Sequence, residues 1–215
     1  MDTREILSHI DHTVLKAVAT EKDIDALCEE ALKYGTASVC IPPSYVKYAK
    51  EKYPELNICT VIGFPLGYNT SAVKVFETEQ AIKDGADEVD MVVNLGDVKN
   101  GHFDRVTAEI SALKKAAGSK VLKVIIETCY LTDDEKTKLC RCVTDGGADY
   151  IKTSTGFGTA GAKIEDIRLF KEHIGKNVKI KAAGGVKSRA DLEMFLNEGC
   201  DRIGTSSAVK ILTDK

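Results

Sequence analysis

The sequence lacks the marks of several protein classes. Charged residues make up 29% of the chain, are spread along it and leave a net charge of −3, so no basic block indicates nucleic acid or an anionic membrane. No apolar run approaches the ~18 residues of a membrane span. The first residues, MDTREILSHIDHT, have neither the basic start nor the apolar middle of a signal peptide. We therefore expect a cytoplasmic protein whose partner is a small molecule, with neither nucleic acid nor membrane as a partner.

Cysteine pairs and linker segments are missing as well. The seven cysteines form an odd set without a CxxC pair, which argues against a disulfide framework and against a zinc site. No Pro/Ser-rich linker divides the chain, and 215 residues suit one domain with one substantial core. The expected organisation is a single domain over residues 1–215 with reduced, mostly buried thiols.

What the sequence does contain is one phrase that recurs: an amphipathic helix, a glycine with small residues, and a short β-rich strand. It is present in EEALKYGTASVCI, EQAIKDGADEVDMVVN, CRCVTDGGADYIKTS and FLNEGCDRIGTS. With HIDHTVL, NICTVIGF, KVLKVIIET and NVKIKAAGG there are eight strands, and the helices between them imply parallel pairing with right-handed crossovers. Because no GxGxxG turn follows the first strand, a closed (β/α)8 TIM barrel is favoured over an open doubly wound sheet.

Several of these strands alternate between apolar and polar residues, although parallel strands covered on both faces are normally apolar throughout. In EVDMVVN, Val89 and Met91 share one face and Asp90 lies on the other. Since helices cover the outside of a barrel, the polar face must point into the lumen. The charged side chains expected there are Asp90, Lys123, Glu127, Lys152 and Lys181.

Two of these lysines, Lys152 and Lys181, lie on adjacent strands that run into glycine-rich loops. Like charges within a few ångström lower each other's pKa, so burial and a neighbouring ammonium can bring one amine from ~10.4 toward about 7 or 8. An unprotonated lysine can attack a sugar aldehyde or ketone and form a Schiff base. For a single strand lysine, snorkelling to the surface or ion pairing are the alternatives. The pair indicates carbon–carbon chemistry through an imine.

Glycine-rich segments follow the last three strands: STGFGTAG, AAGGVKS and RIGTSSAVKIL. Glycine lets backbone N–H groups approach a ligand closely, and SSAVKIL is typical of a short helix that starts at the same place. Loops seven and eight with an extra helix form the usual phosphate site of such barrels. One loop alone could simply turn the chain, but the three together predict a phosphorylated small metabolite as the ligand.

At these residues the sequence resembles the deoxyribose-phosphate aldolase family. The motifs IDHTVLK, ASVCIPP, VIGFPLG, ADEVDMVVN, KVIIET, YIKTSTGF, KAAGGV and RIGTSS stand in the family's order over nearly the whole chain. The resemblance implies a class I aldolase, a lyase of deoxyribose phosphate catabolism, that reversibly splits 2-deoxy-D-ribose 5-phosphate into D-glyceraldehyde 3-phosphate and acetaldehyde. It implies a lysine Schiff base, no metal and no cofactor. A homodimer is one arrangement compatible with it.

The resemblance also assigns roles by matching motif. Lys152 corresponds to the Schiff-base lysine, Lys181 to the cation that lowers its pKa, and Asp90 to the carboxylate of the proton relay. Cys40 matches a cysteine beside the active site that is not itself catalytic. The substrate-binding residues that the family motifs imply are Cys40, Thr155, Gly156, Gly184, Gly185, Lys187, Gly204, Ser206 and Ser207.

Three features depart from the family pattern, and one of them is that the chain as given stops at ILTDK, without the tyrosine-bearing tail that reaches the active site in some relatives. Lys187 stands where many relatives have arginine, which puts bidentate phosphate contact in doubt, and Phe157 stands where some relatives carry a basic residue. We expect catalysis to be retained with a weaker preference for phosphate. Among the histidines only His12 lies in a family motif, and a hydrogen-bonding or packing role is expected for it.

Two other functions would suit the same barrel. A phosphosugar isomerase or epimerase needs paired carboxylates or a metal cluster at the strand ends, and the sequence offers no His/Asp set for that. A barrel that only binds a phosphorylated metabolite would keep the glycine loops but has no need of both lysines. The lysine pair therefore favours the aldolase.

Overall fold

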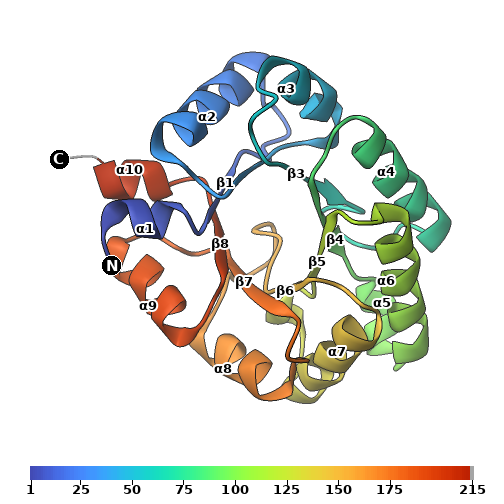
Figure 1. The fold of residues 1–215 in the computed structure, drawn as a ribbon. Helices are drawn as coiled ribbons and strands as arrows, with labels where there is room; N and C mark the ends of the chain where they lie inside the picture. Colours follow the sequence, from blue (N-terminus) through green and yellow to red (C-terminus); the bar gives the residue numbers. More distant parts are fainter. Residues whose placement is uncertain (214–215) are drawn as a thin grey trace.

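A computed structural model describes residues 1–213 of the chain. Its parallel strands close into a barrel in which each strand pairs with the next along the sequence (Figure 1). The strands are β1 Ile10–Thr13, β2 Ser38–Cys40, β3 Ile58–Ile62, β4 Glu88–Val92, β5 Val121–Ile125, β6 Tyr150–Lys152, β7 Lys179–Ala183 and β8 Arg202–Thr205. All eight expected strands are present, and the predicted (β/α)8 TIM barrel is confirmed.

Helices form a ring around the strands (Figure 1). They are α1 Thr3–Leu7, α2 Glu21–Tyr34, α3 Val46–Lys52, α4 Ser71–Lys83, α5 Leu95–Lys99, α6 Phe103–Ala117, α7 Asp133–Asp145, α8 Ile164–His173, α9 Arg189–Glu198 and α10 Ala208–Thr213. Two short 3₁₀ turns, η1 Pro43–Tyr45 and η2 Thr128–Tyr130, follow β2 and β5. Within residues 1–213, no helix combines the length and the apolar content needed to cross a membrane.

Local sequence explains where several helices begin and end. Thr20, Thr132 and Ser188 cap α2, α7 and α9, and in each case an acidic residue three positions later completes a capping box. Helix α2 ends at Gly35, whose positive φ of 68° suits glycine. The three N-caps fix the loops that lead from a strand into a helix, and Gly35 turns the chain from α2 toward β2.

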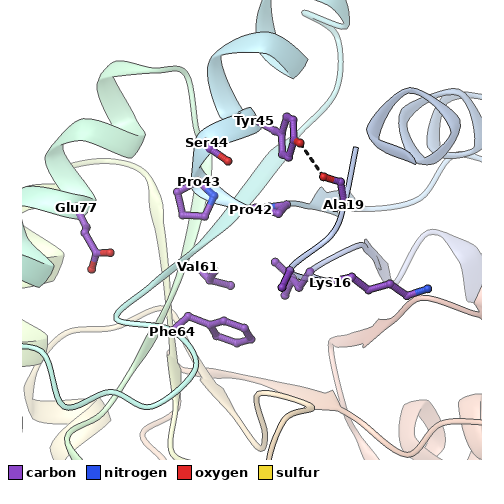
Figure 2. A pocket seen from close by; sticks show the side chains of 11 residues that line it. Lys16, Ala19, Pro42, Pro43, Ser44, Tyr45, Val61, Phe64 and Glu77 are labelled. Atoms are coloured by element: carbon purple, nitrogen blue, oxygen red, sulfur yellow. Dashed lines mark hydrogen bonds between the residues drawn. The ribbon is translucent and has the colours of Figure 1, made fainter. Parts of the chain in front are cut away.

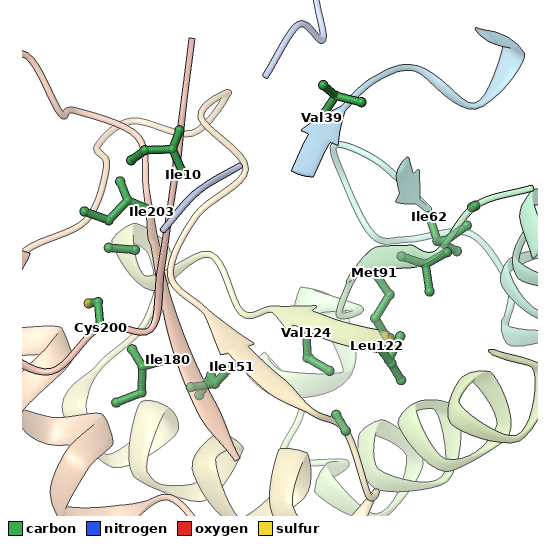
Figure 3. Packing of buried hydrophobic residues seen from close by; sticks show 14 of the residues in the cluster. Ile10, Val39, Ile62, Met91, Leu122, Val124, Ile151, Ile180, Cys200 and Ile203 are labelled. Carbon is green, nitrogen blue, oxygen red and sulfur yellow. The ribbon is translucent and has the colours of Figure 1, made fainter. Parts of the chain in front are cut away.

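The barrel wall is apolar on its outer side. Ile10, Ile180 and Ile203 are fully or almost fully buried and join the main hydrophobic core with residues of the surrounding helices (Figure 3). Side chains of a strand point alternately to its two faces. The next residues, such as Asp11 and Lys181, therefore point into the lumen, and the polar lumen expected from the strand alternation is confirmed.

In three of the four recurring phrases an aspartate follows the glycine, and this aspartate sets the register at the floor of the barrel. Asp87, Asp149 and Asp201 each precede a strand and accept a hydrogen bond from a backbone N–H of the strand before it. The donors are Ile58 at 3.3 Å, Leu122 at 2.8 Å and Ile180 at 3.0 Å. The repeated sequence phrase thus encodes a repeated contact between neighbouring strands.

Candidate active site

Four of the five charged residues expected in the lumen meet around one carboxylate, that of Asp90, whereas Glu127 instead bonds to Thr155 in the loop after β6. Its Oδ2 lies 2.7 Å from Nζ of Lys152 and 2.7 Å from Nζ of Lys181, and its Oδ1 lies 2.8 Å from Nζ of Lys123. All four side chains are buried. Strand register brings them together, because Asp90 pairs with Lys123 across β4 and β5, and Lys152 pairs with Lys181 across β6 and β7. One carboxylate therefore joins both candidate catalytic lysines.

A second lumen carboxylate, Asp11 on β1, was missed by the sequence analysis. Its Oδ2 contacts Nζ of Lys181, and its Oδ1 accepts a hydrogen bond from Arg202 at 2.7 Å. Strand alternation narrows the choice to Asp11 or His12, which must face opposite ways, but it does not decide which of the two points into the lumen. His12 Nε2 lies 2.8 Å from the carboxylate of Glu30 on α2, which agrees with the hydrogen-bonding role expected for that histidine.

Charges at the floor of the barrel complete the cluster. Arg202 Nη2 lies 2.5 Å from Glu88 Oε1, and the other oxygen of Glu88 contacts Nζ of Lys123. The cluster thus combines four cationic side chains with three carboxylates. The four cations are Lys123, Lys152, Lys181 and Arg202, and the carboxylates are Asp11, Glu88 and Asp90. When every group is ionised, one positive charge has no balancing carboxylate within the cluster.

These contacts fix the charge of two key groups. Burial alone would raise the pKa of Asp90, but the ammonium groups of Lys123, Lys152 and Lys181 outweigh it and hold that pKa well below its usual range. Burial would lower the pKa of Lys181, but the carboxylates of Asp11 and Asp90 outweigh it and raise that pKa. Asp90 therefore stays anionic and Lys181 stays cationic at neutral pH.

The lowered pKa values of Asp11 and Asp90 predict that the fold loses stability in acid. Their contribution to the free energy of unfolding is complete above the unfolded pKa of about 3.9 and is lost as pH falls through the folded values. The raised pKa values of Lys123 and Lys181 make a contribution to the free energy of unfolding that is complete below about pH 10.4, so acid does not reduce it. Urea unfolding at a series of pH values is expected to show a decline below about pH 4. A free energy of unfolding that rises between about pH 5 and pH 3 would contradict this assignment of charges.

A cavity of about 460 Å³ opens at the carboxyl ends of the strands. Lys152 lines it, and loops after β1, β6, β7 and β8 supply most of its wall. Seven of the expected substrate-binding residues line this cavity: Thr155, Gly156, Gly184, Gly185, Gly204, Ser206 and Ser207. The lysine cluster and the glycine loops thus belong to one site.

The local sequence explains the shape of this cavity. Gly184 and Gly185 both have positive φ, 79° and 78°, a conformation that L side chains rarely adopt. At Gly204 an added Cβ would lie 3.1 Å from Cε of Lys181, so glycine leaves the room that the buried lysine needs. The backbone N–H of Thr155 donates to Glu127 at 3.0 Å and its hydroxyl contacts the same carboxylate, which holds the loop after β6 in place.

Two expected binding residues lie outside the cavity wall. Cys40 is buried in the lumen, and its sulfur, that of Cys59 and a carboxylate oxygen of Asp90 lie within 4.8 Å of one another. Lys187 is exposed in the loop after β7, where its backbone N–H donates to Asp191 at 2.9 Å. The two sulfurs and the carboxylate could bind a metal only in competition with the lysine ammonium groups that already contact Asp90.

Comparisons with known proteins agree with this geometry. Residues 6–207 match a family model described as DeoC/LacD family aldolase. A deoxyribose-phosphate aldolase of Clostridium botulinum (strain Alaska E43 / Type E3) is 62% identical over 213 residues, which cover 99% of this chain and 96% of the relative. The deoxyribose-phosphate aldolase of Clostridioides difficile (strain 630) is also 62% identical, over 99% of this chain and 97% of the relative.

Solved structures give the same result. QR15, an aldolase, superposes with a TM-score of 0.93 and 38% identity, covering 97% of this chain and 94% of the other. The deoxyribose phosphate aldolase from Aeropyrum pernix, described as a unique tetrameric structure, has a TM-score of 0.90 and 34% identity, covering 98% of this chain and 91% of the other.

Proposed function

The chain belongs to the deoxyribose-phosphate aldolase family, within the DeoC/LacD aldolases, and from this premise we propose that it cleaves 2-deoxy-D-ribose 5-phosphate through a Schiff base on Lys152. The protein is a carbon–carbon lyase of deoxyribose phosphate catabolism. The observation that carries the proposed mechanism is the position of Asp90 Oδ2, which lies 2.7 Å from the amines of both Lys152 and Lys181. Lys152 in turn lines the cavity that the glycine-rich loops enclose.

Lys152 is the nucleophile in this proposal because of its contacts. It has one carboxylate partner, Asp90, whereas Lys181 has two and Lys123 has three. Loss of one proton from the cluster balances its charges, and Lys152 gives up the fewest ionic contacts when it loses that proton. Lys152 is also the member of the cluster that lines the cavity. The nitrogen that becomes the free amine, Nζ of Lys152, therefore belongs to the residue that a substrate in the cavity would contact.

The reaction then follows from these positions. The amine of Lys152 attacks C1 of the open-chain sugar, and loss of water gives an iminium that draws electrons from the bond between C2 and C3. Asp90, acting through a water molecule, takes the proton of the C3 hydroxyl as that bond breaks and glyceraldehyde 3-phosphate leaves. The remaining enamine is protonated at C2, and water hydrolyses the imine to release acetaldehyde and the free amine.

The part of the cavity lined by glycine and serine is assigned to the 5-phosphate. Gly184, Gly185, Ser206 and Ser207 line it, and backbone N–H groups in such glycine-rich turns suit an anion. Gly161 packs closely on this turn, since a Cβ there would lie 2.3 Å from the carbonyl carbon of Gly184. The loop is thereby held in a fixed shape before the ligand arrives.

Borohydride trapping tests the proposed Schiff base. Treatment of the protein with acetaldehyde and borohydride is expected to add one ethyl group per chain, because the reductant converts the imine into a stable secondary amine. Peptide mass spectrometry is expected to place the group on Lys152, with no such modification when the aldehyde is left out. Absence of the group on Lys152, with activity present in the same sample, would exclude the mechanism.

EDTA treatment of protein that has not been trapped with borohydride separates this mechanism from a metal-dependent one. Because the proposed electron sink is an iminium, full activity is expected after exhaustive treatment with EDTA and removal of the chelator. Loss of activity that zinc restores would instead favour a metal-dependent aldolase, with Cys40, Cys59 and Asp90 as the first residues to test.

Two features beyond the reaction are proposed as well. The cysteines at 28, 40, 59, 129, 140, 142 and 200 are all free thiols, which supports a reducing, cytoplasmic location. Exposed Tyr68, Val73 and Phe76, on the loop before α4 and on α4 itself, support association of two copies as a homodimer. The Aeropyrum pernix relative is described as a tetramer. Analytical ultracentrifugation measures the assembly directly.

A further inference from the structure

We propose that Lys16, on the loop after β1, is the side-chain cation that binds the phosphate of the substrate. The inference rests on the proposed function, because it assigns a further residue to the same site. It also replaces Lys187, the lysine that family motifs assign to this task, with a residue from the opposite end of the sequence.

The wall of the cavity shows which cations can reach the ligand. Among residues 1–213, the charged side chains that line it are those of Lys16 and Lys152. Lys152 is bound to Asp90 and reserved for the sugar carbonyl. Lys187 does not line the cavity, and Phe157 brings an aromatic ring to the position where some relatives carry a basic residue. A dianionic phosphate in this cavity is therefore left with Lys16 as its side-chain counter-charge.

The backbone that carries Lys16 is held at the mouth of the barrel. The N–H of Val14 donates to the carbonyl of Cys40 at 3.0 Å, and the N–H of Ala19 donates to the carbonyl of Lys16 at 3.0 Å. The hydroxyl of Tyr45 donates to the carbonyl of Ala19 at 2.7 Å, as Figure 2 shows. The loop is thus fixed at both ends, so the lysine stem starts from a defined point.

Lys16 also lies between two cavities of different chemistry. The second cavity, of about 270 Å³, shares Leu15 and Lys16 with the first and is otherwise lined largely by apolar residues such as Pro42, Val61 and Phe64. Figure 2 shows the Lys16 side chain extended, with its nitrogen pointing away from Pro43 and Glu77. An anion is therefore expected on the glycine side of Lys16, where backbone N–H groups add to the ammonium.

The ammonium of Lys16 is available for a ligand. Within the described chain, it lies within ion-pair distance of no carboxylate. The nearby carboxylate of Asp23 already accepts hydrogen bonds from the backbone N–H and the hydroxyl of Thr20, at 2.8 and 2.6 Å. On the other side, Glu77 accepts from the backbone N–H of Gly63 at 2.9 Å. Lys16 thus has a charge that the folded chain itself does not neutralise by direct contact.

Steady-state kinetics with two sugars test this assignment. Lys16→Met keeps the apolar stem and removes the charge, so KM for deoxyribose 5-phosphate is expected to rise about tenfold with kcat changed less than about twofold. The kcat/KM for unphosphorylated deoxyribose is expected to stay close to that of the parent. The tenfold effect should shrink in about 0.5 M salt, which screens an exposed charge pair. Lys16→Arg, which keeps the charge, should recover most of the phosphate preference.

Two lysine controls sharpen the result. Lys22→Met removes an exposed charge from the first turn of α2, outside the cavity wall, and should leave the ratio of the two kcat/KM values unchanged. Lys187→Met should lower that ratio less than Lys16→Met does. The proposal would be overturned if Lys16→Met left the ratio of the two kcat/KM values unchanged, whether or not both values fell. A larger effect of Lys187→Met on that ratio would overturn it as well. A parent enzyme inactive on both sugars would instead refute the proposed function.

Discussion

Lys152→Met is expected to lower kcat/KM for deoxyribose 5-phosphate by about 10⁴-fold or more, because the imine is the electron sink of the whole reaction. Lys16, the other amine that lines the cavity among residues 1–213, does not contact the Asp90 carboxylate and cannot take over this step. The ethyl group added by acetaldehyde and borohydride should disappear from the variant together with the activity. The loss should appear in kcat as well as in kcat/KM, since the chemical step itself is removed.

The fold should survive this substitution. Asp90 keeps Lys123 and Lys181 as partners when Lys152 is replaced, so the buried carboxylate is not left unpaired. Circular dichroism of the variant is expected to match that of the parent. Lys179→Met serves as the matched control, because Lys179 is a strand lysine at the exposed start of β7, with its ammonium 5.7 Å from the Tyr150 ring. Substantial activity in Lys152→Met, or a comparable loss in Lys179→Met, would move the nucleophile elsewhere.

The architecture could be predicted from the sequence because its signals are local and repeated. Four helices, α2, α4, α7 and α9, end within two residues of a glycine that leads into the next strand, and this phrase recurs around the barrel. The polar alternation of β4, β6 and β7 identified the lumen-facing side chains without knowledge of their partners. Both signals depend on strand periodicity alone, which a sequence shows directly.

The partners across the lumen could not be predicted in the same way. Lys181 contacts Asp11, which lies 170 positions earlier in the chain, because β1 and β7 flank β8 in the closed barrel. Nothing local in IDHTVLK distinguishes Asp11 from His12 as the lumen residue. Likewise Lys16 reaches the cavity of the last three strands only because the barrel closes β1 against β8. Contacts created by closure need the three-dimensional structure.

Lys181→Leu should lower activity at neutral pH by about 10²- to 10³-fold while leaving Lys152 in place. In the parent, four cations share three carboxylates, so one proton can leave the cluster and balance its charges. Without Lys181 the remaining three cations match the three carboxylates with Lys152 still protonated. The carboxylate of Asp90 then holds the proton on Lys152, and less free amine is available for attack.

The pH dependence distinguishes this electrostatic role from a merely structural one. Because the variant should form its free amine only at higher pH, the ascending limb of its kcat/KM profile should move to higher pH, and part of the lost activity should return there. Lys74→Met is the matched control, since Lys74 is equally buried but bonds to Glu109 at 2.8 Å outside the lumen. That control should lose stability and keep the parent's profile. A kcat/KM profile of Lys181→Leu that is lower at every pH, with its ascending limb at the same pH as in the parent, would contradict this role. The charge of Lys181 would then not set the protonation of Lys152, and Lys181 would act on the reaction by another route.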